Sequence, residues 1–116
     1  ERMREAFENK DFDAYTAADL DFHETILRST GNQLLSIVML SLRKVMEVWM
    51  GLAAKAHWTD LGVRGHDAVY EAIFDRDPER AFTAMKEHLE VGFITLERVP
   101  LSGKDRALAK ELLGAR

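Results

Sequence analysis

Apolar side chains recur at steps of three and four residues along most of this 116-residue chain. That spacing gathers them on one face of an α-helix, and no stretch alternates apolar and polar residues for long enough to predict a strand. Glycine and proline together number only nine, which is typical of a helix-rich globular protein and not of a disordered one. We therefore expect an all-α fold of about five to six helices.

Helix boundaries follow from capping residues and turn residues. Gly31 is expected to end one helix, and the pair Asp77-Pro78 is expected to start another with Asp as N-cap and Pro in the first turn. The expected helices are residues 1–9, a helix from Asp13 to near Ser29, a long one over Gln33–Ala56, one carrying His66 to Phe74, one from Pro78 to before Pro100, and a short one over Lys104–Leu113 capped by Ser102. Residues 57–60 and Gly62 are expected to connect two of them.

The apolar faces predict which side of each helix is buried. The long third helix carries an apolar band wide enough to pack against more than one neighbour, so we expect it to be central. The helix that follows should bury a stripe of His66, Val69, Tyr70, Ile73 and Phe74, and the next one should turn Ala81, Met85, Leu89 and Leu96 inward.

Composition and charge limit the kinds of metal site and the binding partners that this chain can have. Cysteine is absent, so a transition metal would have to be held by imidazole and carboxylate groups. The formal net charge of −4 and the lack of a Lys/Arg cluster argue against binding of nucleic acid by this segment.

No apolar run reaches the length of a membrane span and no signal-peptide pattern is present, so we expect a cytoplasmic protein. The chain begins at Glu1 in what reads as the middle of a helix, which predicts a segment of a longer protein.

Two polar residues lie on the inward stripe of the second expected helix. Asp19 and His23 are four residues apart, and on a helix this separation stacks them on one face. A buried carboxylate needs a compensating cation or hydrogen-bond donors. An Asp–His pair that satisfies itself in the core explains these two residues as well as a metal site does.

Two further histidines lie on apolar stripes, eleven residues before and eleven residues after Asp77. In an antiparallel helix pair, residues equally far from the turn come level, so His66 and His88 should face each other. Three inward histidines and one inward aspartate form a complete ligand set for a first-row metal. Ordinary hydrogen-bonded core histidines remain the alternative.

The order of these residues resembles a known family. The segment Asp19-Leu20-Asp21-Phe22-His23, then Gly31-Asn32, His66, Glu71-Ala72-Ile73, Asp77, Ala81, Met85 and His88-Leu89 is similar to the FCD domain, the C-terminal domain of FadR-type GntR transcription regulators. The similarity covers roughly residues 11–96. Gly65 departs from the pattern, because the family often has an acidic residue before this histidine.

The resemblance implies an antiparallel helical bundle in which Asp19, His23, His66 and His88 bind a divalent metal. We expect zinc, with nickel or manganese as alternatives, and a small organic acid as an effector that binds at the metal. Residues 1–116 would then form one effector-binding and dimerisation domain of a homodimer, and DNA would be bound by a winged helix-turn-helix domain that this chain does not contain.

Arg43 is the cation that we expect to complete the effector pocket, since a guanidinium can bind a carboxylate through two hydrogen bonds. A surface arginine with a solvated head group is the alternative. Two other functions compete with effector sensing: a metal-dependent hydrolase and a purely structural dimerisation domain. A hydrolase would need a general base beside the metal, and Glu24 and Glu87 are expected to point elsewhere on their helices. We therefore predict a protein that is not an enzyme.

Overall fold

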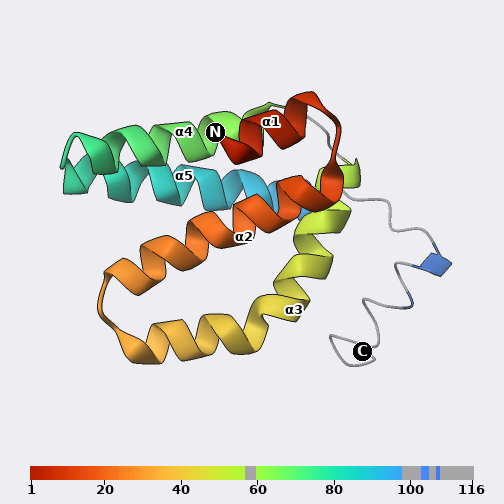
Figure 1. Ribbon diagram of the computed structural model, residues 1–116, viewed down its shortest axis with the longest axis horizontal. Helices are drawn as coiled ribbons and strands as arrows, with labels where there is room; N and C mark the ends of the chain where they lie inside the picture. Colours follow the sequence, from red (N-terminus) through yellow and green to blue (C-terminus); the bar gives the residue numbers. More distant parts are fainter. Residues whose placement is uncertain (57–59, 98–102, 105–106, 108–116) are drawn as a thin grey trace.

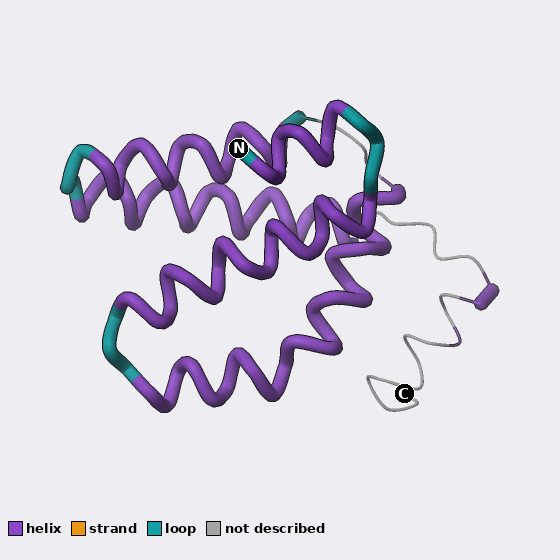
Figure 2. Tube along the Cα trace, in the orientation of Figure 1, coloured by secondary structure: helices purple, strands orange, loops and turns teal. Residues whose placement is uncertain are grey.

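The structure is a computed structural model, and it describes residues 1–56, 60–97, 103–104 and 107 (Figure 1). Residues 1–97 contain five α-helices, and the described part of the chain contains no strand (Figure 2). The helices are α1 (Arg2–Glu8), α2 (Phe12–Ser29), α3 (Gln33–Ala56), α4 (Leu61–Phe74) and α5 (Pro78–Glu97). The prediction of an all-α fold is confirmed.

Polar side chains cap three of these helices, and one of them, Asp77, is the N-cap that the sequence predicted. The Asp11 carboxylate accepts a hydrogen bond from the backbone N–H of Ala14 at 2.9 Å, and the Asn32 side chain accepts one from Leu34 at 3.1 Å. The Asp77 carboxylate accepts one from Arg80 at 3.0 Å. Such caps satisfy N–H groups that have no partner within the helix. They explain why α2, α3 and α5 begin where they do.

The helices form two antiparallel hairpins, α2–α3 and α4–α5 (Figure 1). Packing is most extensive within each hairpin, while α1 packs against α2 and also touches α4. The turns at the hairpin ends contain residues with positive φ, Gly31 at 70° and Arg76 at 56°. The chain therefore brings α2, from its first half, next to α4 and α5, from its second half.

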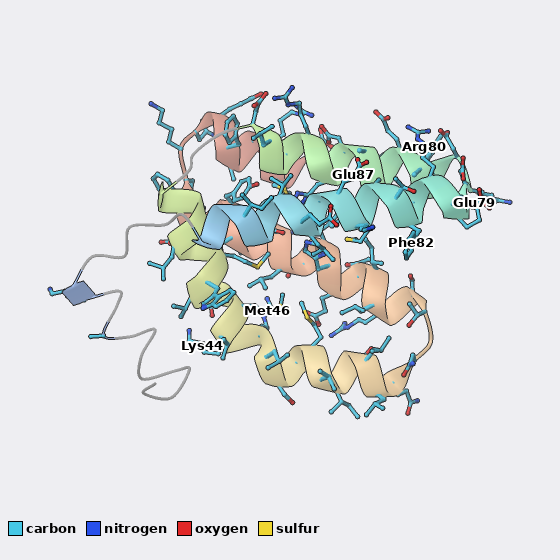
Figure 3. All side chains as sticks on the ribbon, turned by 180° about the vertical axis from the view of Figure 1, so that it is seen from behind. Lys44, Met46, Glu79, Arg80, Phe82 and Glu87 are labelled. Atoms are coloured by element: carbon cyan, nitrogen blue, oxygen red, sulfur yellow. The ribbon has the colours of Figure 1, made fainter. Side chains whose placement is uncertain are left out.

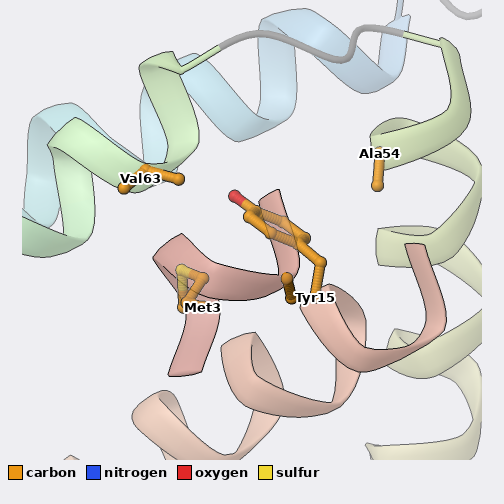
Figure 4. Packing of buried hydrophobic residues seen from close by; sticks show 5 residues of the cluster. Met3, Tyr15, Ala54 and Val63 are labelled. Carbon is orange, nitrogen blue, oxygen red and sulfur yellow. The ribbon is translucent and has the colours of Figure 1, made fainter. Parts of the chain in front are cut away.

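A small apolar core joins the two hairpins near the start of α2. It contains Met3 from α1, Tyr15 from α2, Ala54 from α3 and Val63 from α4 (Figure 4). The Tyr15 ring spans this core and its hydroxyl points towards α4 (Figure 4). Four helices thus converge at this end of the molecule.

The expected burial of α3 is wrong for the first half of that helix. Leu34 is 69% exposed and Ile37 is 59% exposed, and Leu35, Val38 and Leu42 are exposed as well. The helix packs chiefly on α2 and makes a smaller contact with α5, so most of the apolar band in this half has no neighbour among the described residues. Within the described residues, α3 is an outer helix and not a central one.

The predicted stripes on α4 and α5 are only partly correct. Val63, His66, Val69 and Ala72 form the buried face of α4, whereas Tyr70, Ile73, Phe74 and, on α5, Leu89 are exposed. Gly62 lies inside the first turn of α4 and not in the connection before it. The side chain of Leu96 and most of the helix expected over Lys104–Leu113, including its cap Ser102, lie outside the described residues. No helix among the described residues is long and apolar enough to cross a membrane.

Candidate metal centre

Four side chains from three helices converge at one point between the hairpins. Asp19 and His23 come from successive turns of α2, His66 comes from α4 and His88 comes from α5. One ligand atom from each residue lies within 4.8 Å of the other three. The structure thus brings together all four residues that the sequence singled out as metal ligands.

The distances between these atoms suit coordination of one ion. The Asp19 Oδ1 atom lies 2.8 Å from His66 Nε2 and 3.3 Å from His23 Nε2, and His23 Nε2 lies 3.3 Å from His88 Nε2. Bonds of 2.0–2.2 Å to one zinc-like ion would separate neighbouring ligand atoms by roughly 3–3.6 Å. These three distances lie near that range and all four ligand atoms lie within 4.8 Å of one another, so the arrangement is compatible with one divalent ion.

The hydrogen bonds of His66 support a cation at this point. Its Nδ1 lies 2.6 Å from the carbonyl oxygen of Gly62, and its Nε2 faces the carboxylate of Asp19. A neutral imidazole carries a single N–H and cannot donate to both oxygens. If Nδ1–H donates to Gly62, as is usual for metal-bound histidines, the Nε2 lone pair points at a carboxylate oxygen. That contact is favourable only with a second proton on the ring or a metal ion between the two atoms.

Burial and pairing set the charge of the site. Asp19 and His66 are 8% and 4% exposed. Burial by itself would raise the pKa of the Asp19 carboxyl, but hydrogen bonds from His23 and His66 lower that pKa to about 2. Burial, together with the neighbouring His66 and His23, lowers the pKa of His88 to about 4. At neutral pH, Asp19 is thus an anion and His88 a neutral imidazole, which are the forms that bind metals.

Aromatic contacts hold the imidazole rings in place. The rings of His23 and His88 are stacked with centroids 5.3 Å apart, and the centroids of His66 and His88 are 4.1 Å apart. Phe22 packs its ring edge-to-face against His66 at 4.9 Å. The Phe22 ring therefore forms an apolar wall beside the candidate ligands.

A glycine that the sequence analysis placed in a loop also supports the site. Gly62 supplies the carbonyl that fixes the His66 ring, and a Cβ atom at this position would collide with the Tyr15 hydroxyl. Burial raises the pKa of Tyr15, and the negative charge of Asp19 raises it further. The signal in the sequence was Gly62 itself, which we interpreted as part of a connection, although a glycine within a helix can have a packing reason.

Arg43 is not among the residues gathered at this point. Its guanidinium pairs across the α2–α3 hairpin with Glu24 and, at 3.4 Å, with Asp21. Asp21 lies about 200° around α2 from Asp19 because each helical residue turns about 100°. The ion pairs thus hold Arg43 near the side of α2 opposite the candidate ligands.

Comparison with known proteins gives a family match over most of the chain. Residues 1–91 match the model of a family described as the FCD domain. A segment of 78 residues, 63% of this chain, is 35% identical to the galactonate operon transcriptional repressor of Escherichia coli (strain K12) and covers 33% of that protein. The chain therefore matches about a third of the length of this curated relative. No solved structure matches the chain significantly.

Proposed function

Because this chain belongs to the FCD domain family, we propose that it is the ligand-sensing domain of a bacterial GntR/FadR-type transcription regulator. In this proposal one divalent metal ion binds at Asp19, His23, His66 and His88, and a small organic acid binds at the metal. The observation that carries the proposal is the convergence of one carboxylate oxygen and three Nε2 atoms at a buried point. Binding of the acid would bias the arrangement of a DNA-binding domain elsewhere in the longer protein.

We propose zinc as the metal. Imidazole and carboxylate ligands in a set of four suit zinc, while nickel and manganese accept the same donors in sites with more ligands. When bound, such an ion supplies a Lewis acid with open positions for an anionic oxygen. The chain's own residues orient it: Gly62 and Phe22 hold His66, and the stacked rings of His23 and His88 hold each other.

Charge favours an organic acid as the effector. A divalent cation beside the single carboxylate of Asp19 and three neutral imidazoles leaves a local charge near +1, which attracts anions. The relative in Escherichia coli is a repressor named for a galactonate operon, and galactonate is a sugar acid. We therefore propose a sugar acid, or a di- or tricarboxylate, as the class of effector for this chain.

Arg43 is our proposed second contact for the effector, and this role requires a rearrangement. The guanidinium must first leave Glu24 and Asp21. An effector carboxylate could compete with these partners because Arg43 is half-buried and its guanidinium can bind any carboxylate through two hydrogen bonds. Release of Glu24 would loosen the contact between α2 and α3 and so couple effector binding to the packing of this hairpin.

Exposed apolar residues on α3 support the proposal of a homodimer. Residues 33–42 carry no charged side chain, and among them Leu34, Ile37 and Leu40 are exposed. A helix that is apolar on several faces is normally covered. We propose that a second copy of the chain packs on this part of α3, in the cytoplasm, where the DNA of a bacterial regulator lies.

A metal-dependent hydrolase is less well supported by the charged residues near the ligands. Glu24 follows His23 directly, but Arg43 and Arg28 both pair with its carboxylate. Glu87, which Figure 3 labels on α5, precedes His88 and is exposed. A carboxylate engaged by two guanidinium groups is a poor general base, and membership of a family that contains a transcriptional repressor favours a regulator.

Calorimetry with galactonate as the probe tests the proposed function. We expect galactonate to bind to the zinc-loaded chain at least tenfold more tightly than galactitol, a neutral polyol of similar shape, because only the acid has a charge to place at the metal. Chelation of the zinc should abolish the binding. Equal binding of galactonate before and after chelation would contradict an effector site that works through the metal.

A further inference from the structure

Tyr15 lies against Gly62 one helical turn before the contact between Asp19 and His66. Tyr15 and Asp19 are four residues apart on α2, and Gly62 and His66 are four residues apart on α4. On each helix this separation places the two residues on successive turns of one face. The buried Tyr15 ring reaches across to α4 with its hydroxyl foremost (Figure 4). The two helices are thus joined by two contacts, one turn apart.

No side chain fits at position 62 while the Tyr15 hydroxyl stays in place. A Cβ atom there would lie less than 3.0 Å from the hydroxyl oxygen, but 3.6 Å from the ring carbon that carries this oxygen. Real Cβ atoms essentially never approach another heavy atom more closely than 3.0 Å, whereas 3.6 Å is an ordinary van der Waals contact. The conflict is therefore with one oxygen atom, which rests against the bare backbone of α4.

The contact bears on His66 because little else sets the distance between α2 and α4. Among the described residues, α2 packs mainly on α3 and α1, while α4 packs mainly on α5. His66 Nδ1 lies 2.6 Å from the carbonyl oxygen of Gly62, so a shift of this turn of α4 carries the imidazole with it. A spacer between the helices at Gly62 therefore acts on the 2.8 Å contact between His66 and Asp19.

We propose that the Tyr15 hydroxyl positions a metal ligand: resting on Gly62, it sets how closely α4 approaches α2 and so holds His66 Nε2 within reach of the ion that Asp19 binds. This inference rests on the proposed metal function. Burial raises the pKa of Tyr15, and the negative charge of Asp19 raises it further, so the hydroxyl stays neutral. Tyr15 thus acts as a spacer that adds no charge to the site.

The variant Gly62→Ala tests the inference, and Gly51→Ala is its control. Gly51 on α3 also faces α2, but a Cβ atom there meets only Thr16 Oγ1, at 3.9 Å. We expect Gly62→Ala to push the Tyr15 hydroxyl and α4 apart and to weaken zinc binding by roughly 10- to 100-fold, the usual effect of disturbing a group that orients a ligand. The visible absorption of bound cobalt should also change, because its intensity depends on the number and geometry of ligands. Gly51→Ala should alter neither property.

Removal of the hydroxyl should rescue the alanine variant. In the double variant of Tyr15→Phe with Gly62→Ala, the new methyl group meets only the ring carbon at 3.6 Å. Its zinc affinity and cobalt absorption should therefore return to those of Tyr15→Phe. Tyr15→Phe alone removes one atom of the spacer and should weaken zinc binding less than Gly62→Ala does. If Gly62→Ala does not fold, the double variant should still fold and bind zinc as Tyr15→Phe does.

The outcomes separate this inference from the proposed function. An unaltered chain that binds neither zinc nor cobalt would contradict the proposed function itself. If the unaltered chain binds zinc and either Gly62→Ala or Tyr15→Phe binds it equally tightly, only the role of Tyr15 is contradicted. Equal losses of affinity from Gly62→Ala in the unaltered and Tyr15→Phe backgrounds would show that alanine acts on α4 directly and not through the hydroxyl.

Discussion

His66 Nε2 lies 2.8 Å from Asp19 Oδ1 although the Nδ1 atom of the same ring lies 2.6 Å from the carbonyl oxygen of Gly62. The imidazole thus faces two oxygen atoms, one on its own helix α4 and one on α2. Each of these oxygen atoms needs a hydrogen-bond donor or a cation. Because Asp19 also contacts His23, the carboxylate links both halves of the candidate site. Because of this contact, we expect the loss of one of the four residues to affect the others.

Replacement of His66 by alanine should destabilise the chain chiefly when metal is present. A metal that binds only the folded state stabilises it by about 2.7 kcal/mol when its free concentration is a hundred times Kd, and His66→Ala should lose most of this increment. Urea denaturation of both proteins, once with zinc and once with chelator, measures the loss of stability with and without metal. Equal destabilisation under the two conditions would favour a purely structural role for the histidine.

Acid should destabilise the metal-free chain in two steps. The pKa of His88 is about 4 in the folded chain against an ordinary value of 6.5, so the unfolded state takes up a proton first as the pH falls. Stability should therefore decrease from pH 6.5 to pH 4. The pKa of Asp19 is about 2 against 3.8, which adds a second decrease between these lower values.

The variant His88→Gln isolates the first of these steps, because glutamine does not titrate. Urea midpoints of both proteins, measured in chelator from pH 7 to pH 4, should show that the unaltered chain loses more stability than the variant over this range. Parallel curves would contradict the lowered pKa of His88, since all other titrating groups are shared by the two proteins.

Arg43→Ala should weaken binding of the effector, with Arg28→Ala as the matched control. Both arginines pair with Glu24, but only Arg43 is proposed to contact the effector. The loss should amount to roughly 1.5–3 kcal/mol, the value of a hydrogen bond to a charged group. Calorimetry with galactonate on the zinc-loaded variants measures it. Equal effects of the two substitutions would assign the loss to Glu24 and not to Arg43.

A charge on the exposed face of α3 should disrupt the proposed dimer. Ile37→Glu introduces a carboxylate where 59% of the residue is exposed, so the monomer should tolerate it while a second copy should not. Light scattering after size-exclusion chromatography gives the mass in solution. Lys86→Gln on α5, also exposed, provides a control with the same change in net charge. A dimer that survives Ile37→Glu would rule out this part of α3 as the contact.

The helix boundaries could be predicted from the sequence better than the burial of the helix faces. A cap acts within a few residues of its own position, so Asp77 and Pro78 correctly predicted the start of α5. The caps Asp11 and Asn32 were not predicted, although the expected starts of α2 and α3 were close to the observed ones. Burial depends on which neighbour covers an apolar face. Periodicity alone could not show that Leu34 and Phe74 would be exposed, because it describes one helix at a time.

In the candidate site, too, contacts within one helix or one hairpin could be predicted, and contacts between the hairpins could not. Helical spacing paired Asp19 with His23, and equal distances from a turn paired His66 with His88. The contact of Asp19 with His66 could not be predicted from residue spacing, because this contact depends on how the two hairpins pack. The pairing of Arg43 with Glu24 was missed because it depends on how α3 packs on α2.

The metal content of the untagged chain tests the central claim most directly. The chain should be purified without a histidine tag and dialysed against buffer that contains trace metals. The metal content per chain should then be measured by inductively coupled plasma mass spectrometry. We predict about one divalent ion per chain, as expected for a site that couples metal binding to folding, and a metal content near zero in a variant that combines Asp19→Asn with His66→Ala. An unaltered chain that contains no more metal than this variant, even after incubation with zinc, would contradict the assignment of Asp19, His23, His66 and His88 as a metal site.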